Sequence, residues 1–180
     1  RAFDLPPAAH GPRVLGFFPG STIGNLSPRA AVDLLRRFRE TLGPGARMLI
    51  GIDTRKNPRM LEAAYDDAQG VTAAFNLNLL ARANRELDTR FNLAQFTHHA
   101  FYNAPRQRIE MHLISRSRQR VDVGGQTFEF AEGETLHTEN SHKFTVDGLR
   151  RLARQAGFTP GPVWTDVDRL FSVHWLHAPA

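Results

Sequence analysis

The first third of the chain alternates short apolar runs with a segment of helical periodicity. The apolar residues of 13–18 predict a buried strand, and Met48–Ile52 predict a second one. Between them, apolar residues recur at helical spacing from Ala31 to Phe38. Ser27 and Pro28 are typical of a helix start, so we expect a helix through Leu42. Two buried strands separated by a helix indicate a parallel sheet of the α/β class.

The pattern changes after residue 57. Residues 58–90 are rich in helix formers, with interruptions at Asp66-Asp67 and Gly70, and 72–87 predicts one amphipathic helix. Alternation of apolar and polar residues then predicts strands over 96–102, 108–115, 119–123 and 126–130, with Gly124-Gly125 as a hairpin turn. This block is expected to form an α+β insertion that interrupts the parallel sheet.

The last part returns to the first pattern. A helix is predicted over 145–156, with Thr145 as its N-cap and Gly157 at its end. Two short strands follow over 163–166 and 170–176, joined by a polar turn. We therefore expect a sheet core over 1–56, the inserted domain over 57–143, and the remainder of the core over 144–180.

Composition narrows the class of protein. The chain has 180 residues, 41% hydrophobic and 23% charged, as expected for one globular domain with a large insertion. Its apolar runs fall short of the ~18 residues that a membrane-spanning helix needs, so no membrane partner is expected. The net charge is +5, but the arginines are scattered among acids, which favours a solvated surface over a nucleic-acid site. There is no cysteine, which excludes disulfides and thiolate chemistry and fits a reducing, cytoplasmic setting.

The turn after the first predicted strand is the leading candidate for a ligand site. Pro19-Gly20-Ser21-Thr22 leads into Ile23-Gly24-Asn25, and ligands of open α/β sheets bind just beyond the carboxyl ends of strands. Small residues there leave backbone groups accessible to a ligand. A strand-to-helix turn with no ligand is the alternative.

Two further motifs carry suitable side chains. Tyr65, followed by Asp66-Asp67, offers a hydroxyl that can donate or accept, although a solvated helix end explains the same residues. Glu139 and Ser141 are two residues apart, so in an extended segment they point to one side and could hold an N–H-bearing ring such as imidazole. The alternative for 137–143 is an exposed polar loop.

Other chemistry finds little support in the sequence. The asparagines of 76–84 are expected to hold the helix to a loop through buried hydrogen bonds. His98-His99 and His137/His142 lack the spacing of a metal motif, so no metal is expected. No nucleophile elbow, phosphate loop or paired catalytic acids are visible. Group transfer from a bound cofactor fits this set of residues best.

With these motifs in view, the chain resembles the histidine-specific N-alpha-methyltransferases of ergothioneine biosynthesis. Four segments match in one order: FFPGSTIGN at 17–25, AYDDAQGVTAAFNLNLLARANREL at 64–87, RIEMHL at 108–113 and TENSHKF at 138–144. The resemblance implies S-adenosylmethionine-dependent trimethylation of the α-amino group of histidine to hercynine. It also implies a Rossmann-like class I methyltransferase sheet, whose usual closing elements are a helix and a strand pair.

The resemblance assigns roles to particular residues. Asn25 and Tyr65 would hold the carboxylate and amine of histidine and orient the amine for methyl transfer. Glu139 and Ser141 would hold the imidazole ring. Gly20 and Ser21 would contact the methionine part of the cofactor.

The same resemblance implies that the chain corresponds to the second half of such an enzyme. Family members carry an N-terminal half with most of the cofactor site, so we expect this chain to be a truncated and inactive fragment, with an unpaired edge strand that could form a dimer. Two alternatives remain: a methyltransferase of the same scaffold for another amino acid or amine, and a non-catalytic amino-acid-binding or interaction module.

Overall fold

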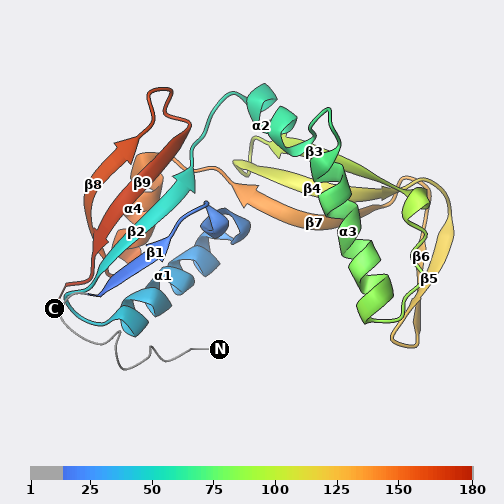
Figure 1. Ribbon diagram of the computed structural model, residues 1–180, viewed down its shortest axis with the longest axis horizontal. Helices are drawn as coiled ribbons and strands as arrows, with labels where there is room; N and C mark the ends of the chain where they lie inside the picture. The colour runs from blue at the N-terminus through green and yellow to red at the C-terminus, as the bar shows by residue number, and fades with distance from the viewer. Residues whose placement is uncertain (1–13, 180) are drawn as a thin grey trace. The chain divides into compact units, whose positions relative to one another are not determined.

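Most of the predicted helices and strands are present in the computed structural model, which describes residues 14–179. The chain divides into two compact units, each described separately below. Unit 1 combines the residues up to Lys56 with those from Ser141 onward, and unit 2 comprises Asn57–Asn140. The fold is mixed α/β (Figure 1).

The sheet of unit 1 has four strands in the order β1-β2-β9-β8. β1 (Leu15–Phe18) pairs in parallel with β2 (Arg47–Asp53), as predicted. β9 (Phe171–His177) then lies antiparallel to β2, and β8 (Thr159–Thr165) antiparallel to β9. The predicted parallel pair and the final strand pair are therefore both confirmed.

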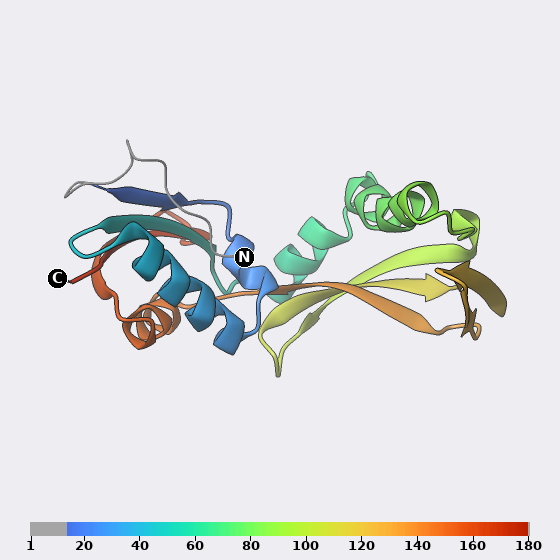
Figure 2. The same cartoon turned by 90° about the horizontal axis from the view of Figure 1, so that it is seen from below.

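Two helices cover one face of this sheet (Figure 2). In α1 (Pro28–Leu42) the N-cap Ser27 accepts a hydrogen bond from the Ala30 amide, and in α4 (Val146–Gln155) Thr145 accepts one from Gly148. The buried core combines Ala31 and Leu35 of α1, Leu149 and Ala153 of α4, and Met48, Ile50, Ile52 and Leu176 of the strands. Both caps were predicted because the residues that form them are local in sequence.

The prediction that the first strand is buried is wrong. Leu15 is 53% exposed and Phe17 is 67% exposed. Among the described residues β1 pairs with β2 alone, so it lies at the edge of the sheet, and these two side chains point away from α1 and α4. Arg13, where the strand was expected to begin, lies outside the described residues. Pairing of this edge with a second copy stays a prediction.

Unit 2 is built around a three-stranded sheet in the order β3-β4-β7. Its strands are β3 (Phe96–Asn103), β4 (Arg108–Ser115) and β7 (Thr135–His142). Helices α2 (Pro58–Tyr65) and α3 (Val71–Glu86) pack on one face of β3 and β4. β5 (Gln119–Val123) and β6 (Gln126–Phe130) form the predicted hairpin, whose turn residues Gly124 and Gly125 both have positive φ. Within residues 14–179 the 3-10 turns are η2 (Thr22–Asn25) in unit 1 and η3 (Leu93–Gln95) in unit 2.

Two predictions of extended structure were incomplete. Residues 135–142 form the strand β7, where a polar loop was one of the two interpretations, and its last two residues belong to unit 1. β8 begins at Thr159, four residues before the predicted start, because Pro160 and Pro162 hid the strand. The ladder with β9 changes register between Pro160 and Val163, which accommodates these residues.

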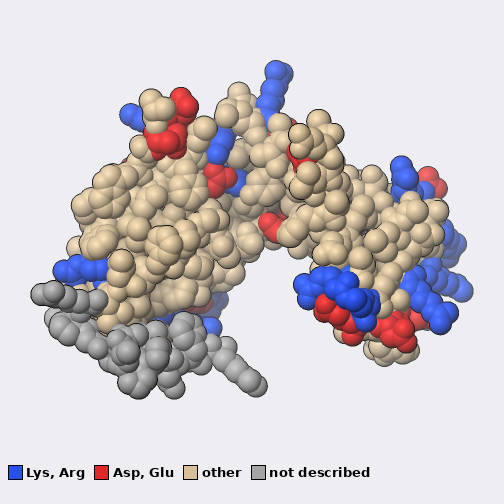
Figure 3. All heavy atoms as spheres, viewed as in Figure 1, with Lys and Arg blue, Asp and Glu red and all other residues tan. Residues whose placement is uncertain are grey.

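Charged side chains of both signs are interspersed, as predicted. In unit 2, Arg82 pairs with Glu86, and Arg118 and Arg120 pair with Glu129. Figure 3 shows positive and negative side chains gathered together over the end of α3 and the β5–β6 hairpin. No helix of residues 14–179 has both the length and the apolar character needed to cross a membrane.

Candidate functional site

The turn after β1 is fixed against the end of β2. Gly20 and Ser21 follow one another with φ of 75° and 59°, both in the left-handed region. The Ser21 amide donates to the Gly51 carbonyl at 3.1 Å, and its hydroxyl accepts from the Asp53 amide at 2.8 Å. These two bonds stabilise Ser21 in a backbone conformation that is unfavourable for residues other than glycine.

Gly20 lies exposed in this turn. A Cβ built on it would have no atom within 4 Å, so its backbone can be approached closely. The turn therefore fits a group that contacts backbone atoms at the carboxyl end of β1, as the predicted cofactor would. The amide and hydroxyl of Ser21 are hydrogen-bonded to Gly51 and Asp53, so Ser21 stabilises the shape of this turn.

Asn25 is exposed at the end of η2, beside a very close approach of two backbone segments. A Cβ built on the preceding Gly24 would lie 2.9 Å from the His142 carbonyl oxygen and 3.6 Å from the Ser141 hydroxyl. The turn that carries Asn25 thus packs directly on the end of β7 that carries Ser141.

A buried ion pair joins Ser141 to the end of β2. The side chain of Lys143 is 0% exposed, and its Nζ lies 2.7 Å from Asp53 Oδ2 and 2.8 Å from Ser141 Oγ. Asp53 Oδ1 pairs with Lys56 at 2.6 Å. Asp53 therefore connects the turn at Ser21, through its own amide, with the lysine that contacts Ser141.

In unit 2, the backbone at Tyr65 is held by a histidine whose tautomer the contacts define. His98 Nε2 lies 2.8 Å from the Tyr65 carbonyl, and its Nδ1 lies 2.9 Å from Asn76 Nδ2. Since a carbonyl only accepts and an amide NH2 only donates, His98 carries its proton on Nε2. Asn76, 3% exposed, also donates to the His112 carbonyl at 3.2 Å and so ties α3 to the sheet.

Glu139 lies in β7, beside a pocket of about 150 Å³ in unit 2. The pocket is lined by α3, β4 and β7, through Phe75, Asn76, Asn78, Leu79, Arg82, Met111, Thr138 and Glu139. The Thr138 hydroxyl donates to the Met111 carbonyl at 3.0 Å. The lining thus offers apolar surface together with hydrogen-bonding and charged groups, which can orient a small polar ligand.

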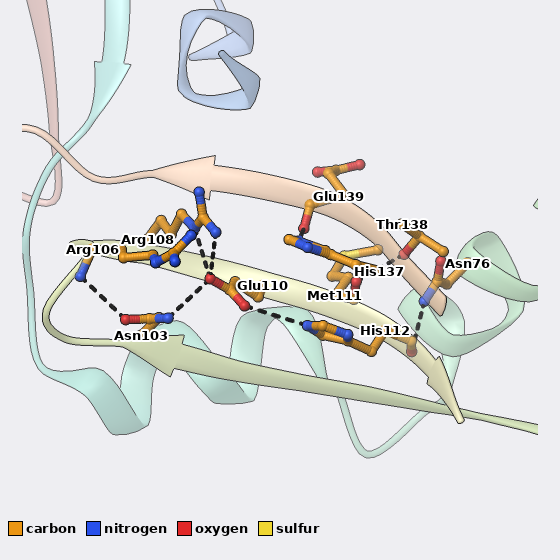
Figure 4. Close-up of polar contacts among 10 residues, drawn as sticks. All are labelled: Asn76, Asn103, Arg106, Arg108, Glu110, Met111, His112, His137, Thr138 and Glu139. Atoms are coloured by element: carbon orange, nitrogen blue, oxygen red, sulfur yellow. Dashed lines mark hydrogen bonds and ion pairs between the residues drawn. The ribbon is translucent and has the colours of Figure 1, made fainter. Parts of the chain in front are cut away.

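A polar network surrounds Glu110 on β4 (Figure 4). Glu110 is 7% exposed and accepts from Arg108 Nε at 2.8 Å and from Asn103 at 2.9 Å. Burial alone would raise the pKa of Glu110, but the bonds from Arg108 and from His112 outweigh it, and the pKa is lowered. Burial lowers the pKa of His112, opposed by its contact with Glu110, so the imidazole is neutral near pH 7.

The groups of Glu110, His112 and His137 lie within 4.8 Å of one another. The rings of His112 and His137 are stacked, with centroids 4.5 Å apart and an interplanar angle of 16°. Nitrogen lone pairs lie in the ring plane, so two nearly parallel rings do not aim them at one ion. His137 Nε2 also contacts the Glu139 carbonyl at 3.0 Å, and Glu110 is bound by a guanidinium. We therefore propose no metal here.

The candidate residues fall in both units. Gly20, Ser21, Asn25 and Ser141 belong to unit 1, whereas Tyr65 and Glu139 belong to unit 2. Sequence reasoning assigned no role to Asp53 or Lys143. Asp53 could have been found, because it is an acidic residue at the carboxyl end of a buried strand.

Comparison with known proteins identifies the family. The family model described as "Histidine-specific methyltransferase, SAM-dependent" matches residues 2–178. The chain therefore belongs to the histidine-specific, SAM-dependent methyltransferases.

Curated relatives carry consistent names. A histidine N-alpha-methyltransferase of Mycolicibacterium smegmatis is 45% identical over 87% of this chain and 50% of its own length. One of Mycobacterium tuberculosis is 42% identical over 87% of this chain and 49% of its own. Ergothioneine biosynthesis protein 1 of Neurospora crassa is 30% identical over 81% of this chain and 17% of its own. The chain thus spans about half the length of the two bacterial relatives.

Proposed function

We propose that the protein transfers methyl groups from S-adenosylmethionine to the α-amino group of L-histidine, giving hercynine in ergothioneine biosynthesis. The observation that carries this proposal is the match of the histidine-specific family model to residues 2–178. Two relatives named histidine N-alpha-methyltransferase, at 45% and 42% identity, support the same substrate. The fungal relative's name supports the pathway.

The two units have separate tasks in this proposal. Unit 1 is the second half of a Rossmann-like methyltransferase sheet, and its turn at Gly20 receives part of the cofactor. Unit 2 is an inserted substrate-binding domain. Its pocket beside Glu139, which combines apolar side chains with amide, hydroxyl and charged groups, supports that task.

Four side chains would bind histidine. Asn25 and Tyr65 hold its carboxylate and amine, and Glu139 and Ser141 hold its ring. A carboxylate only accepts hydrogen bonds, so Glu139 suits a ring N–H. Asn25 is exposed at the end of its turn, where a ligand can reach it.

The chemistry asks the protein mainly to orient the amine. S-adenosylmethionine, when bound, supplies a methyl group activated by its sulfonium. The amine must be unprotonated to accept it, and α-amino groups of peptides titrate near ~8. Asn25 and Tyr65 would present the amine lone pair, which is a positioning role that needs no general base of unusual pKa.

The test is histidine binding and methylation by the full-length protein with Glu139 replaced. Glu139→Ala should raise the apparent KM for histidine by about 10- to 100-fold, because a hydrogen bond to a charged group contributes roughly 1.5–3 kcal/mol. Glu132→Ala, which removes an exposed acid from the turn before β7, should leave it unchanged.

Three results would contradict the proposal. An unchanged histidine affinity in Glu139→Ala would remove Glu139 from the ring site. Methylation of another amino acid or amine, with none of histidine, would favour the same scaffold with a different substrate. Binding of histidine without any methylation would instead indicate an amino-acid-binding module.

A further inference from the structure

Lys143 carries a fully buried ammonium group, and two of its contacts connect Asp53 with Ser141. Its side chain is 0% exposed, and Nζ lies between Asp53 Oδ2 at 2.7 Å and Ser141 Oγ at 2.8 Å. Burying an ion pair contributes little to stability on balance, because desolvation offsets the attraction. Stability alone therefore does not explain why this ion pair is buried.

The ammonium group defines how Ser141 can bond. A lysine ammonium has donors only, so Ser141 Oγ must accept from Nζ. The hydroxyl proton of Ser141 then lies on the side of Oγ that faces away from Lys143. Accepting from a cation also polarises the O–H bond, which strengthens it as a donor.

The surroundings hold this arrangement in place. Asp53 is fixed by its backbone, because its amide donates to the Ser21 hydroxyl at 2.8 Å. The Phe144 amide donates to the Asp53 carbonyl at 3.1 Å, which anchors the chain just after Lys143. The lysine therefore has a rigid counter-ion and a rigid backbone.

We propose that Lys143 is a positioning residue that fixes Ser141 as a hydrogen-bond donor toward the unprotonated ring nitrogen of the substrate. This inference rests on the proposed function, in which Ser141 and Glu139 hold the ring. Glu139 accepts from a ring N–H, and Ser141 donates to a bare nitrogen. The pair then selects a neutral imidazole, which has one nitrogen of each kind, over a ring that has an N–H alone.

A double-mutant cycle in the full-length protein tests the inference. Lys143→Met should raise the KM for histidine about tenfold and change kcat much less, since a ground-state contact to the ring is lost. Ser141→Ala should have a similar effect. Adding Lys143→Met to Ser141→Ala should then cause little further change, because Lys143 acts through that hydroxyl.

The matched control is Lys56→Met. Lys56 binds the same carboxylate as Lys143 but through Oδ1, and no contact joins it to Ser141 in the described structure. Its replacement should leave the KM for histidine unchanged. Thermal denaturation of each variant shows whether it is folded. Should Lys143→Met fail to fold, Asp53→Asn/Lys143→Met, which removes both charges, is measured in its place.

A ring analogue gives the second readout. An alanine bearing a pyrrole ring has an N–H but no bare nitrogen, so wild type should bind it about tenfold more weakly than histidine, and Lys143→Met should bind it as wild type does. Additive effects of Lys143→Met and Ser141→Ala, or a loss of pyrrole affinity in Lys143→Met, would overturn this inference alone. Absence of histidine binding by wild type would overturn the proposed function as well.

Discussion

Replacing Gly24 by alanine should disturb both the fold and the site, because of where its hydrogen atoms point. Gly24 is buried in η2, directly before Asn25. A Cβ there would meet the His142 carbonyl oxygen at 2.9 Å and the His142 nitrogen at 3.4 Å. Both are backbone atoms of β7, so no side-chain rotation relieves the contact.

The expected loss of stability follows from the distance between the added Cβ and the His142 carbonyl oxygen. Ordinary contact begins at 3.4 Å, so η2 and the end of β7 must separate by the difference from 2.9 Å, about 0.5 Å. Overpacking of this kind costs about 1–3 kcal/mol. For a chain of 180 residues this corresponds to a fall in Tm of roughly 4–8 °C for ~2 kcal/mol. Since an error of 1 Å in position can cost about 100-fold in rate, methylation should fall by roughly tenfold.

Gly16→Ala is the matched control for this substitution. A Cβ at Gly16, in β1, would meet a methyl group of Leu42 at 2.7 Å, and that is the far end of a flexible side chain. Thermal denaturation and histidine methylation are measured for both variants. A Gly24→Ala protein as stable and as active as Gly16→Ala would refute the argument that the backbone contact limits this position.

Two other substitutions test the packing of each unit. Burial, with a smaller contribution from the charge of Arg150, lowers the pKa of His174 to about 4 from 6.5, so the unfolded chain takes up this proton first as the pH falls. The free energy of unfolding should drop by about 2 kcal/mol between pH 7 and 5 through this group, and urea titrations of His174→Gln should show a flatter dependence; equal slopes would contradict it. Asn84→Ala removes two bonds accepted from Thr89 and the Phe91 amide and one donated to the Phe91 carbonyl, so it should cost about 2 kcal/mol in chemical denaturation. The exposed Asn78→Ala on the same helix should cost little, and a similar loss in both would count against the proposed loop anchor.

Features set by neighbouring residues could be predicted from the sequence. Ser27 and Thr145 cap their helices, and Gly124-Gly125 forms its hairpin turn, because each depends on residues within three or four positions. The prediction that an asparagine of α3 holds the helix to a loop is also confirmed, since Asn84 accepts a hydrogen bond from the Phe91 amide in the loop that follows. Strands β3, β4, β5 and β6 of unit 2 were predicted because apolar and polar residues alternate along them.

Features set by distant partners could not be predicted in the same way. The exposure of Leu15 and Phe17 depends on β1 lying at a sheet edge, which an apolar run does not reveal. β7 consists of polar residues apart from Leu136, and its strand character comes from pairing with β4. The side-chain roles of Asp53 and Lys143 arise only when residues 90 positions apart meet, as the pair at 53 and 143 does.

The ion pair between Asp53 and Lys143 limits how the sequence can change at these two positions. Loss of one partner of a buried ion pair costs about 3–5 kcal/mol, because the other charge is left without compensation. The two losses are unequal here, since loss of Lys143 leaves Asp53 paired with Lys56, whereas loss of Asp53 removes the carboxylate that lies 2.7 Å from the buried Lys143 ammonium. Evolutionary drift at the two positions should therefore follow an order: lysine 143 is replaced first, and the aspartate becomes free to change only afterwards.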